Sequence, residues 1–525
     1  MSIKNMMKTS HKLMVVLLTT SFATSSFAAD TGHLDNTFAM TTNLGEIKGA
    51  IKDKVVAFYG IPYAHNPFTP SLRFKAPQPY ENWQGVLDAT HVGAPVPQPG
   101  RGQTVELVGT TEDLTINIWA PVDALNSDQI LPVMVWLPGG AFIREDAGEQ
   151  VYEGTSFAKS NTIVVTVNYR VGVDGFMHLD GAPDNRGILD QIEALKWVQE
   201  NIADFGGNPK RVTLFGQSAG AESVAILLGT DKARGLFQQA IMQSPPMQYL
   251  TAEQADRVTK ALAKDLNTHP TKEGMSKVPF KQLVSSIIKT SNAMQQNRDE
   301  WGMMSWGGTV FLPVVDGVII KKSPMKDLAE NTDSSIPVIV GSTDQEARLY
   351  LVPGNTIDRV KNEEKNLFLN DLSLSGDPLT TYNPTKNKES IGDVYADIKS
   401  DYSFRMPALH IAENLVKNGN KVWHYNFSWS SPAYGGKLGA AHFVDVAFSF
   451  NTLNSAQARS FVGTHPPQEL ADYMHSSWSQ FAHYGSAPWD IYNLTDRATM
   501  RFDTHSEQVN DPEKQVRLLW SDFSF

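Results

Sequence analysis

Two hydrophobic patterns alternate along this chain: short continuous apolar runs, and longer segments in which apolar residues recur every three or four positions. Continuous runs are typical of strands that are buried on both faces of a parallel sheet. They occupy residues 131–137, 162–167, 212–215, 239–243, 336–341 and 421–427. The periodic segments predict helices, as in residues 189–202, where Ile192, Leu195 and Val198 fall largely on one face. This alternation predicts an α/β fold with a large, mostly parallel central sheet and helices on both faces.

The N-terminal and cap regions have different patterns. Residues 45–49 and 56–64 are short apolar and aromatic segments punctuated by glycine, so they predict a small antiparallel part at the edge of the sheet. Residues 251–300 and 353–400 are helix-rich and more polar, so we expect them to be helical cap insertions. Because the chain shows no internal repeat, residues 29–525 are predicted to form a single domain.

Residues 1–28 have the pattern of a cleaved secretory signal peptide. Lys4, Lys8 and Lys12 precede a short apolar core, and Ser26-Phe27-Ala28 offers small residues at a cleavage site. The apolar core is too short to span a bilayer, and no other stretch of the sequence is long and apolar enough to do so. We therefore expect a bacterial protein that is exported to the periplasm or secreted.

Composition narrows the possible partners. The formal net charge is −11, and it becomes −14 when a leader with three lysines and no acid is removed. An acidic protein is a poor candidate for binding nucleic acid or an anionic membrane. The chain contains no cysteine, which excludes a thiol nucleophile, thiolate metal sites and disulfides. We expect a monomer or dimer that needs no metal or cofactor.

The strongest chemical signal is Gly216-Gln217-Ser218-Ala219-Gly220, which lies between the apolar run 212–215 and a helical segment, 222–228. A strand, a sharp turn and a helix form the context in which Gly-x-Ser-x-Gly presents a serine nucleophile. The flanking glycines are needed because a Cβ at either position would collide with the neighbouring strand or helix. The following helix directs its N-terminus at the site, where negative charge develops during the reaction.

The motif and its surroundings resemble the type-B carboxylesterase/cholinesterase family of α/β-hydrolases, in particular its bacterial para-nitrobenzyl-esterase-like members. The resemblance is carried by Gly216–Gly220 together with the upstream segments 184–191, 194–202 and 205–209. It implies an α/β-hydrolase fold and a triad whose members follow in the order serine, acid, histidine. It also implies hydrolysis of a small ester by water.

The general base predicted by the resemblance is His442. It lies in Gly439-Ala-Ala-His442-Phe-Val-Asp445, which matches the family pattern of a glycine, a histidine and an acidic residue, although Phe443 replaces a frequent glycine. His424, within a predicted strand, and His410, within a predicted helix, are the competing candidates.

The predicted acid is Glu346, in Gly341-Ser-Thr-Asp344-Gln345-Glu346-Ala347, which follows a predicted strand. Gln345 and Ala347 depart from the family pattern at this place, so Asp344 stays open as an alternative acid. By resemblance, Ser244 and Asp445 are expected to lie near the triad.

The oxyanion hole is predicted to consist of the backbone N–H groups of Gly140, Ala141 and Ala219. Pro138-Gly-Gly-Ala-Phe142 stands where the family has a run of three glycines, and Gly139 and Gly140 let the loop approach the substrate closely. His442 would take the proton from Ser218, Glu346 would orient the imidazole, and water would hydrolyse the acyl-enzyme. Since the base must be neutral, the rate should fall when the medium is acid enough to protonate it.

The residues around the motif favour neutral, bulky or aromatic esters. Gln217 stands where many relatives have glutamate, and a neutral amide does not attract a cationic substrate. Thr309 and Trp306 lie near the position of acyl-pocket aromatics in cholinesterases, so Gln217, Thr309 and Trp306 are candidate substrate-binding residues. Two alternatives stay open: a catalytically silent cholinesterase-like binding or adhesion protein, and a lipase that acts on longer-chain esters.

Overall fold

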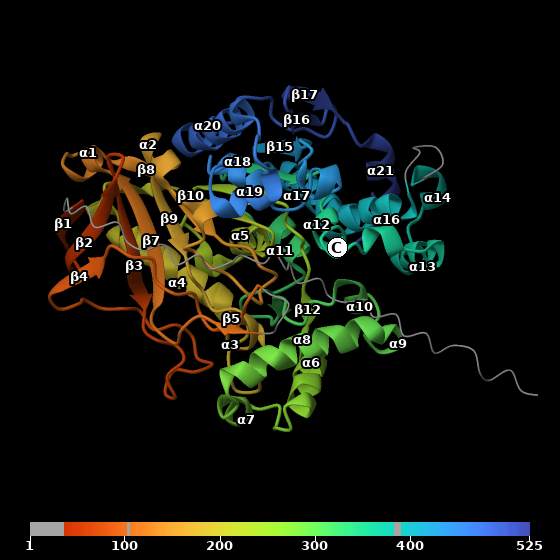
Figure 1. The fold of residues 1–525 in the computed structure, drawn as a ribbon, viewed down its shortest axis with the longest axis horizontal. Helices are drawn as coiled ribbons and strands as arrows, with labels where there is room; N and C mark the ends of the chain where they lie inside the picture. Colours follow the sequence, from red (N-terminus) through yellow and green to blue (C-terminus); the bar gives the residue numbers. More distant parts are fainter. Residues whose placement is uncertain (1–35, 102–105, 383–389) are drawn as a thin grey trace, which may run out of the picture.

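The computed structural model describes residues 36–101, 106–382 and 390–525 (Figure 1). The predicted signal peptide lies outside these residues. In the described chain one sheet of thirteen strands forms the centre of the molecule, in the order β1-β2-β3-β7-β9-β8-β10-β11-β14-β15-β16-β17, with β4 paired to β2. This is the large α/β sheet that the alternating strands and helices predicted, and it agrees with the α/β-hydrolase fold that the family resemblance implied.

The middle of the sheet is parallel and its first strands are antiparallel, as expected. The antiparallel strands are β1 (Thr37–Thr42), β2 (Gly45–Lys52), β3 (Val55–Ala64) and β7 (Leu114–Pro121), while β4 (Val86–Ala89) runs parallel to β2. The parallel strands are β9 (Ile163–Val167), β8 (Leu131–Leu137), β10 (Gly207–Gln217), β11 (Gln239–Gln243), β14 (Val338–Thr343), β15 (Val422–Phe427) and β16 (Ala498–Phe502). An antiparallel strand, β17 (Glu507–Asn510), closes the far edge and was not foreseen from the sequence.

The central strands are apolar without interruption because both of their faces are buried. Along β8, Val133 and Val135 belong to one hydrophobic cluster, whereas Met134 and Trp136 belong to another. The first cluster includes side chains of α4 (Arg186–Asn201), α5 (Ala219–Gly229), α11 (Pro324–Asn331) and α17 (Met406–Asn418). The second includes side chains of α2 (Thr155–Lys159), α18 (Val444–Ser449), α19 (Ala456–Val462) and α20 (Gln468–Tyr484). Alternate side chains of one strand therefore fill two separate cores.

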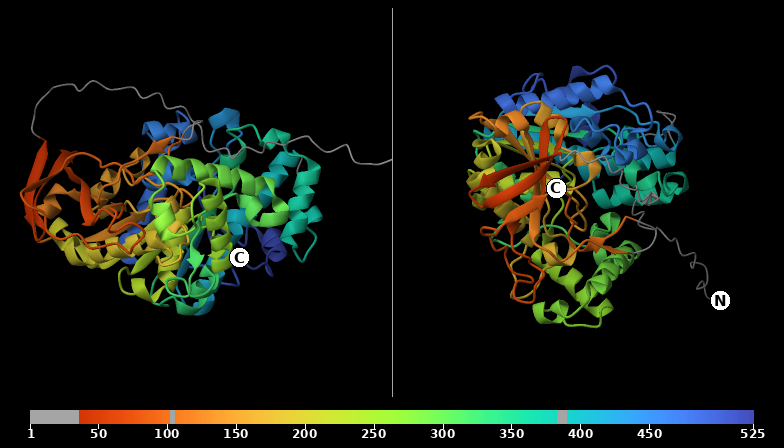
Figure 2. Two further views of the ribbon diagram at one scale, coloured as in Figure 1. Left: turned by 90° about the horizontal axis from the view of Figure 1, so that it is seen from below. Right: turned by 60° about the vertical axis from the view of Figure 1, so that its left-hand side comes forward.

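The two segments expected to form a cap are helical. The first contains α6 (Ala252–Asp265), α7 (Lys272–Ser276), α8 (Phe280–Gln296), α9 (Arg298–Trp301) and α10 (Met304–Gly307). The second contains α13 (Asn362–Leu372), α14 (Pro378–Thr381) and α16 (Ile391–Ser400). Figures 1 and 2 show α13 and α14 at the end of the molecule opposite to β1 and β2. The segments are joined through Trp306, whose indole donates to Asp371 at 2.7 Å and whose carbonyl accepts from Lys399 at 2.9 Å.

Short elements complete the described fold. The helical ones are α1 (Val122–Leu125), α3 (Gly172–Phe176), α12 (Arg348–Leu351) and α21 (Lys514–Leu519). Two small sheets pair β5 (Gln98–Pro99) with β6 (Leu107–Val108), and β12 (Leu250–Thr251) with β13 (Val314–Val315).

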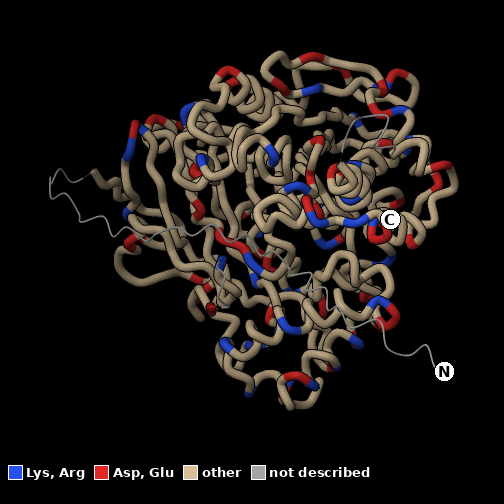
Figure 3. The backbone as a smooth tube through the Cα atoms, turned by 45° about the vertical axis from the view of Figure 1, so that its right-hand side comes forward, with Lys and Arg blue, Asp and Glu red and all other residues tan. Residues whose placement is uncertain are grey.

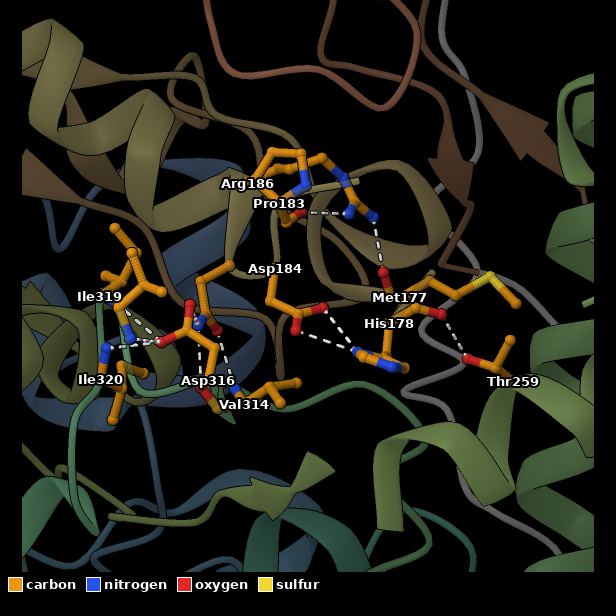
Figure 4. Close-up of polar contacts among 12 residues, drawn as sticks. Met177, His178, Pro183, Asp184, Arg186, Thr259, Val314, Asp316, Ile319 and Ile320 are labelled. Atoms are coloured by element: carbon orange, nitrogen blue, oxygen red, sulfur yellow. Dashed lines mark hydrogen bonds and ion pairs between the residues drawn. The ribbon is translucent and has the colours of Figure 1, made fainter. Parts of the chain in front are cut away.

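The loop before α4 connects the first cap segment to the sheet (Figure 4). The guanidinium of the buried Arg186 donates to the carbonyl oxygens of Pro183 at 2.6 Å and Met177 at 2.7 Å. The Thr259 hydroxyl of α6 donates to the carbonyl oxygen of His178 at 2.7 Å. Arg186 therefore fixes the shape of this loop, and the loop in turn contacts α6 through His178.

Surface charge contributes little to holding this fold together. Figure 3 shows acidic and basic residues interspersed along the backbone. Exposed pairs such as Lys437–Asp358, at 2.7 Å, contribute about 0–1 kcal/mol each because water screens them. In a chain without disulfides, stability therefore rests on the two hydrophobic cores. Within the described residues, no helix has the length and apolar character needed to cross a membrane.

Candidate active site

Ser218 occupies a strained turn between β10 and α5. Its backbone angles are φ 58° and ψ −127°, a region that a residue with a side chain rarely adopts. A Cβ on Gly216 would lie 2.6 Å from the carbonyl carbon of Gly220, and a Cβ on Gly220 would overlap the carbonyl oxygen of Leu137 in β8. The two glycines are therefore required by close packing, as the motif predicted.

The carboxyl ends of three adjacent parallel strands bring the site together. The backbone N–H of Ser218, after β10, donates to the carbonyl oxygen of Gln243 at 2.9 Å, at the end of β11. The N–H of Ser244 in turn donates to the carbonyl oxygen of Gly341 in β14 at 2.8 Å. In sheets of this kind, catalytic residues gather at the carboxyl edge. The loops after these strands carry Ser218, Ser244 and Glu346.

Glu346 and His442 form a buried hydrogen-bonded pair. His442 Nδ1 contacts Glu346 Oε2, and the two residues are 3% and 0% exposed. The other carboxylate oxygen, Oε1, accepts from the Ser244 hydroxyl at 2.6 Å and from the backbone N–H of Thr343 at 2.7 Å. Because Nδ1–H donates to the carboxylate, Nε2 is the atom of the ring that can accept a proton. The structure thus brings together the predicted acid and base.

Gln217, rather than the serine, contacts the ring of His442. The amide nitrogen of Gln217 lies 2.9 Å from Nε2 and 3.4 Å from Nδ1, so it lies over the face of the imidazole, and Gln217 is 1% exposed. Among the residues that the structure describes, no hydrogen bond joins Ser218 Oγ to His442. Gln217 was expected to contact substrate, and its position immediately before Ser218 places the nucleophile beside the base.

Two aromatic rings that the sequence did not single out pack against His442. The centroid of the Phe404 ring lies 4.2 Å from that of the imidazole, and the Tyr350 ring lies 5.8 Å from it. Phe404 belongs to η5 (Asp401–Arg405), a π-helical turn between α16 and α17. No periodic pattern marks such a turn in a sequence, so Phe404 carried no signal, while Tyr350 lies on the short helix α12.

Asp344, the alternative acid, lies in a different place. It lines a cavity of about 430 Å³ together with Asp401, Arg405, Arg501 and Glu513. Burial raises the pKa of Asp344 above its ordinary value and raises that of Asp401 to about 6. The carboxylate that contacts His442 is therefore Glu346.

The competing histidines lie away from Ser218 and Glu346. His424 Nδ1 contacts the hydroxyl of Thr499 at 3.2 Å, and burial lowers the pKa of His424 to about 4. The His410 ring packs against Phe525, with 5.1 Å between the ring centroids. Of the three histidines considered, only His442 lies beside the nucleophile turn.

The predicted oxyanion-hole loop is held in an unusual conformation. Gly140 has φ 131°, Ala141 has φ 55°, and a Cβ on Gly140 would overlap the carbonyl oxygen of Arg144. The N–H groups of Gly140 and Ala141 donate to no atom within the described part of the chain. Ala219 is the first residue of α5, where a helix leaves its N–H groups unpaired. These three N–H groups are available, and their role stays a prediction.

Comparison with known proteins identifies the family of this chain. A profile described as the carboxylesterase family matches residues 36–519. The chain is 34% identical to the para-nitrobenzyl esterase of Bacillus subtilis, over 91% of this chain and 97% of that protein. It is 31% identical to the phenmedipham hydrolase of Pseudarthrobacter oxydans, over 86% and 90% of the two chains. The structure of carboxylesterase EST55 of Geobacillus stearothermophilus covers 92% of this chain and 99% of its own, with a TM-score of 0.80 and 30% identity. This chain belongs to the carboxylesterase family.

The carboxylesterase is thus a carboxylic ester hydrolase, and its remaining predicted residues can be placed around the site. Trp306 packs against Phe368, with 4.9 Å between the ring centroids, and its indole is bonded to Asp371. Thr309 is half-buried, and its hydroxyl has no hydrogen bond within the described residues. Within the described residues, no hydrogen bond or ring contact joins either of them to Ser218 or His442, so their role in substrate binding stays a prediction.

Ser244 and Asp445 have different relations to the predicted triad. Ser244 bonds directly to Glu346, as expected for a residue that supports the acid. Asp445 instead accepts from the Gln243 amide at 2.9 Å and from the Tyr425 hydroxyl at 3.1 Å. Burial raises the pKa of Asp445 to about 6. Asp445 therefore lies one layer further from the reacting atoms.

Proposed function

We propose that this carboxylesterase hydrolyses neutral, bulky or aromatic esters through an acyl-enzyme formed on Ser218. The observation that carries the proposal is the buried Glu346–His442 pair, which lies beside the strained turn of Ser218. A serine hydroxyl is a weak nucleophile until a base removes its proton, and the base needs a carboxylate to fix its orientation. This chain supplies all three groups from segments that are far apart in sequence.

The proposed reaction proceeds in two halves. His442 Nε2 takes the proton of Ser218 as Oγ attacks the ester carbonyl, and Glu346 offsets the positive charge that forms on the ring. The N–H groups of Gly140, Ala141 and Ala219 bind the oxyanion, and each contributes on the order of 3 kcal/mol to the transition state. His442 then gives its proton to the leaving alcohol, and water attacks the acyl-enzyme by the same route.

Several features support the substrate class. Gln217, next to the nucleophile, carries no charge, and Phe404 and Tyr350 provide aromatic surface beside the base. The name of one relative denotes esters of para-nitrobenzyl alcohol. The leader-like pattern of residues 1–28 supports a further proposal, that the enzyme is exported to the periplasm or the medium.

Hydrolysis of a panel of p-nitrophenyl esters by the wild type and by Ser218→Ala tests the proposal. We expect a rapid burst of one p-nitrophenol per chain, and a loss of about 10⁴-fold or more in kcat when the nucleophile is removed. An inert wild type would favour the silent binding protein. A rate that rises sharply only when the ester forms a lipid–water interface would favour the lipase.

A further inference from the structure

Arg144 lies beside the predicted oxyanion loop, at the edge of the candidate active site. Its backbone N–H donates to the carbonyl oxygen of Gly140 at 3.2 Å, and a Cβ built on Gly140 would lie 2.9 Å from Cγ of Arg144. Arg144 is also close enough to Tyr350 for the two side chains to interact electrostatically, and the Tyr350 ring lies 5.8 Å from that of His442. The arginine side chain therefore begins next to a predicted oxyanion donor and lies near a ring that packs against the base.

The side chain of Arg144 lines a cavity of about 440 Å³, a size typical of small-molecule sites. Within the described residues, its guanidinium makes no hydrogen bond and no ion pair, although it has five N–H donors. Burial, with the charge of Arg101, lowers the pKa of Arg144 to about 10, so the group stays protonated at neutral pH. A partly buried cation of this kind is stabilised by an anion that binds to it.

The acidic residues that line the same cavity do not supply this anion. Glu149 is bonded through one carboxylate oxygen to Arg101 and through the other to the amide of Gln457. Burial raises the pKa of Glu145 well above its ordinary value, which favours its neutral form. Burial also raises the pKa of Asp146 to about 6, and this carboxylate accepts from the backbone N–H two residues later at 2.8 Å. Of the two guanidinium groups in the cavity, one is thus paired and the other is available to a ligand.

We propose that Arg144 is a specificity residue, which binds a carboxylate that the ester carries at a distance from the bond to be cleaved. The proposal rests on the acyl-enzyme function proposed above, and it adds acidic esters to the neutral ones as preferred substrates. When the ester carbonyl oxygen meets the N–H of Gly140, an extended substrate reaches the cavity with its remote end. The planar guanidinium matches a carboxylate there because it can donate two parallel N–H···O bonds.

The charge of the whole chain makes this local cation significant. The formal net charge is −11, so at long range the protein repels an acidic ester. A preference for such an ester therefore requires a positive group at the site itself, and Arg144 is placed to provide it. A hydrogen bond between charged groups in a partly buried site should raise kcat/KM about ten- to hundredfold over the matched neutral ester. Because the carboxylate is remote from the reacting atoms, the gain should appear in KM and not in kcat.

The experiment compares two pairs of esters, each consisting of a free acid and its methyl ester. The p-nitrophenyl monoester of adipic acid, against methyl p-nitrophenyl adipate, places the carboxylate on the acyl side. The compound 4-acetoxyphenylacetic acid, against its methyl ester, places the carboxylate on the alcohol side. Initial rates of release of the phenol give kcat and KM for each. We expect the wild type to prefer the acid in one pair, and that pair shows which side of the ester meets Arg144.

Variants at position 144 assign the preference to the guanidinium. In Arg144→Gln the ratio of kcat/KM for the acid to that for its methyl ester should fall to about one, through a rise in KM for the acid. The ratio cancels any general effect of the substitution on the oxyanion loop. Arg459→Gln is the matched control, because it removes the same charge from an exposed position on α19, the helix that also carries Gln457, and it should keep the wild-type ratio.

A ratio of about one for both ester pairs in the wild type overturns the proposal without any variant. A wild-type ratio that persists in folded Arg144→Gln overturns it as well. If the glutamine variant does not fold, Arg144→Met, which keeps an apolar stem but no charge, takes its place with the same expectation. Turnover that depends on Ser218 but shows no preference for the acid would refute the carboxylate site alone. Absence of Ser218-dependent turnover in the wild type would refute the proposed function and the carboxylate site together.

Discussion

The molecule contains two histidine–carboxylate pairs whose local geometry is similar and whose surroundings are not. His442 Nδ1 contacts Glu346 in the active site, and His178 Nδ1 lies 3.0 Å from both oxygens of Asp184 in the loop before α4 (Figure 4). The first pair is almost completely buried, whereas the side chain of His178 is 23% exposed. The carboxylate of Glu346 has further donors in Ser244 and Thr343.

The comparison shows that a carboxylate partner is not by itself enough to predict that a histidine is a catalytic base. What differs is the rest of the polar surroundings. The Gln217 amide, one residue before a strained serine, lies 2.9 Å from Nε2 and 3.4 Å from Nδ1 of His442, whereas within the described chain no hydrogen bond reaches Nε2 of His178. The backbone of His178 holds α6 through Thr259, which is a structural contact. The same pair of residue types is therefore predicted to serve chemistry at one place, while at the other it stands beside a structural contact.

Replacing each histidine in turn should separate the two roles most strongly. We expect His442→Ala to lower kcat by about 10⁴- to 10⁶-fold, because the serine loses its base. His178→Ala should leave kcat/KM for a p-nitrophenyl ester within about twofold of the wild type, since it lies outside the reacting groups. Steady-state kinetics with folded variants checks both values. A comparable loss in the two variants would remove the distinction between the pairs.

Asp344 and Glu346, the two carboxylates on the loop after β14, allow a second test of which groups are needed for the reaction. Glu346→Gln should lower kcat by about 10⁴-fold, because an amide no longer holds the required tautomer of His442. Asp344→Asn should cost at most a few-fold, because Asp344 lies in the charged cavity with Arg405 and Arg501. The measurement is kcat with an activated ester, together with thermal unfolding to show that both variants fold. A large loss of kcat for Asp344→Asn alone would show that Asp344, and not Glu346, is the acid that orients His442.

Much of this architecture could be predicted because local sequence and global fold agree. The central strands were visible as continuous apolar runs since alternate residues such as Val135 and Trp136 fill opposite cores. The turn of Ser218 was visible since only glycine fits at positions 216 and 220. The hairpin of β16 and β17 was missed because short edge strands carry a weak pattern.

What the sequence left open at the site depended on long-range packing. The choice between Glu346 and Asp344 could not be made from two carboxylates on one loop, because only the fold shows which of them meets His442. Phe404 reaches the imidazole from a π-helical turn that has no signature in sequence. The contact between Gln217 and the base likewise arises from the meeting of β10 with a loop more than two hundred residues later.

The smallest expected effect is on stability, and it concerns the His178–Asp184 pair outside the predicted active site. The hydrogen bond that the His178 ring donates to Asp184, with the negative charges of Asp184, Asp180 and Asp256, raises the pKa of His178 above its ordinary value. Because the folded-state pKa exceeds the unfolded one, the pair stabilises the fold fully below the unfolded pKa and loses this contribution as the pH rises through the folded pKa. The pair is partly exposed, so water screens it and the contribution should be about 0.5 kcal/mol or less.

Thermal unfolding of the wild type and Asp184→Asn, from below the unfolded pKa of His178 to above its folded pKa, measures the contribution of the pair to stability. The variant should be less stable on the acid side, where His178 is charged, and the difference should shrink toward zero on the alkaline side. Ester hydrolysis at neutral pH should be unaffected, because the pair lies outside the reacting groups. If the difference instead grew with pH, Asp184 would act mainly through its contacts as an ionised carboxylate and not through the charge of His178. The charge of His178 would then contribute nothing to the stability that the His178–Asp184 pair provides.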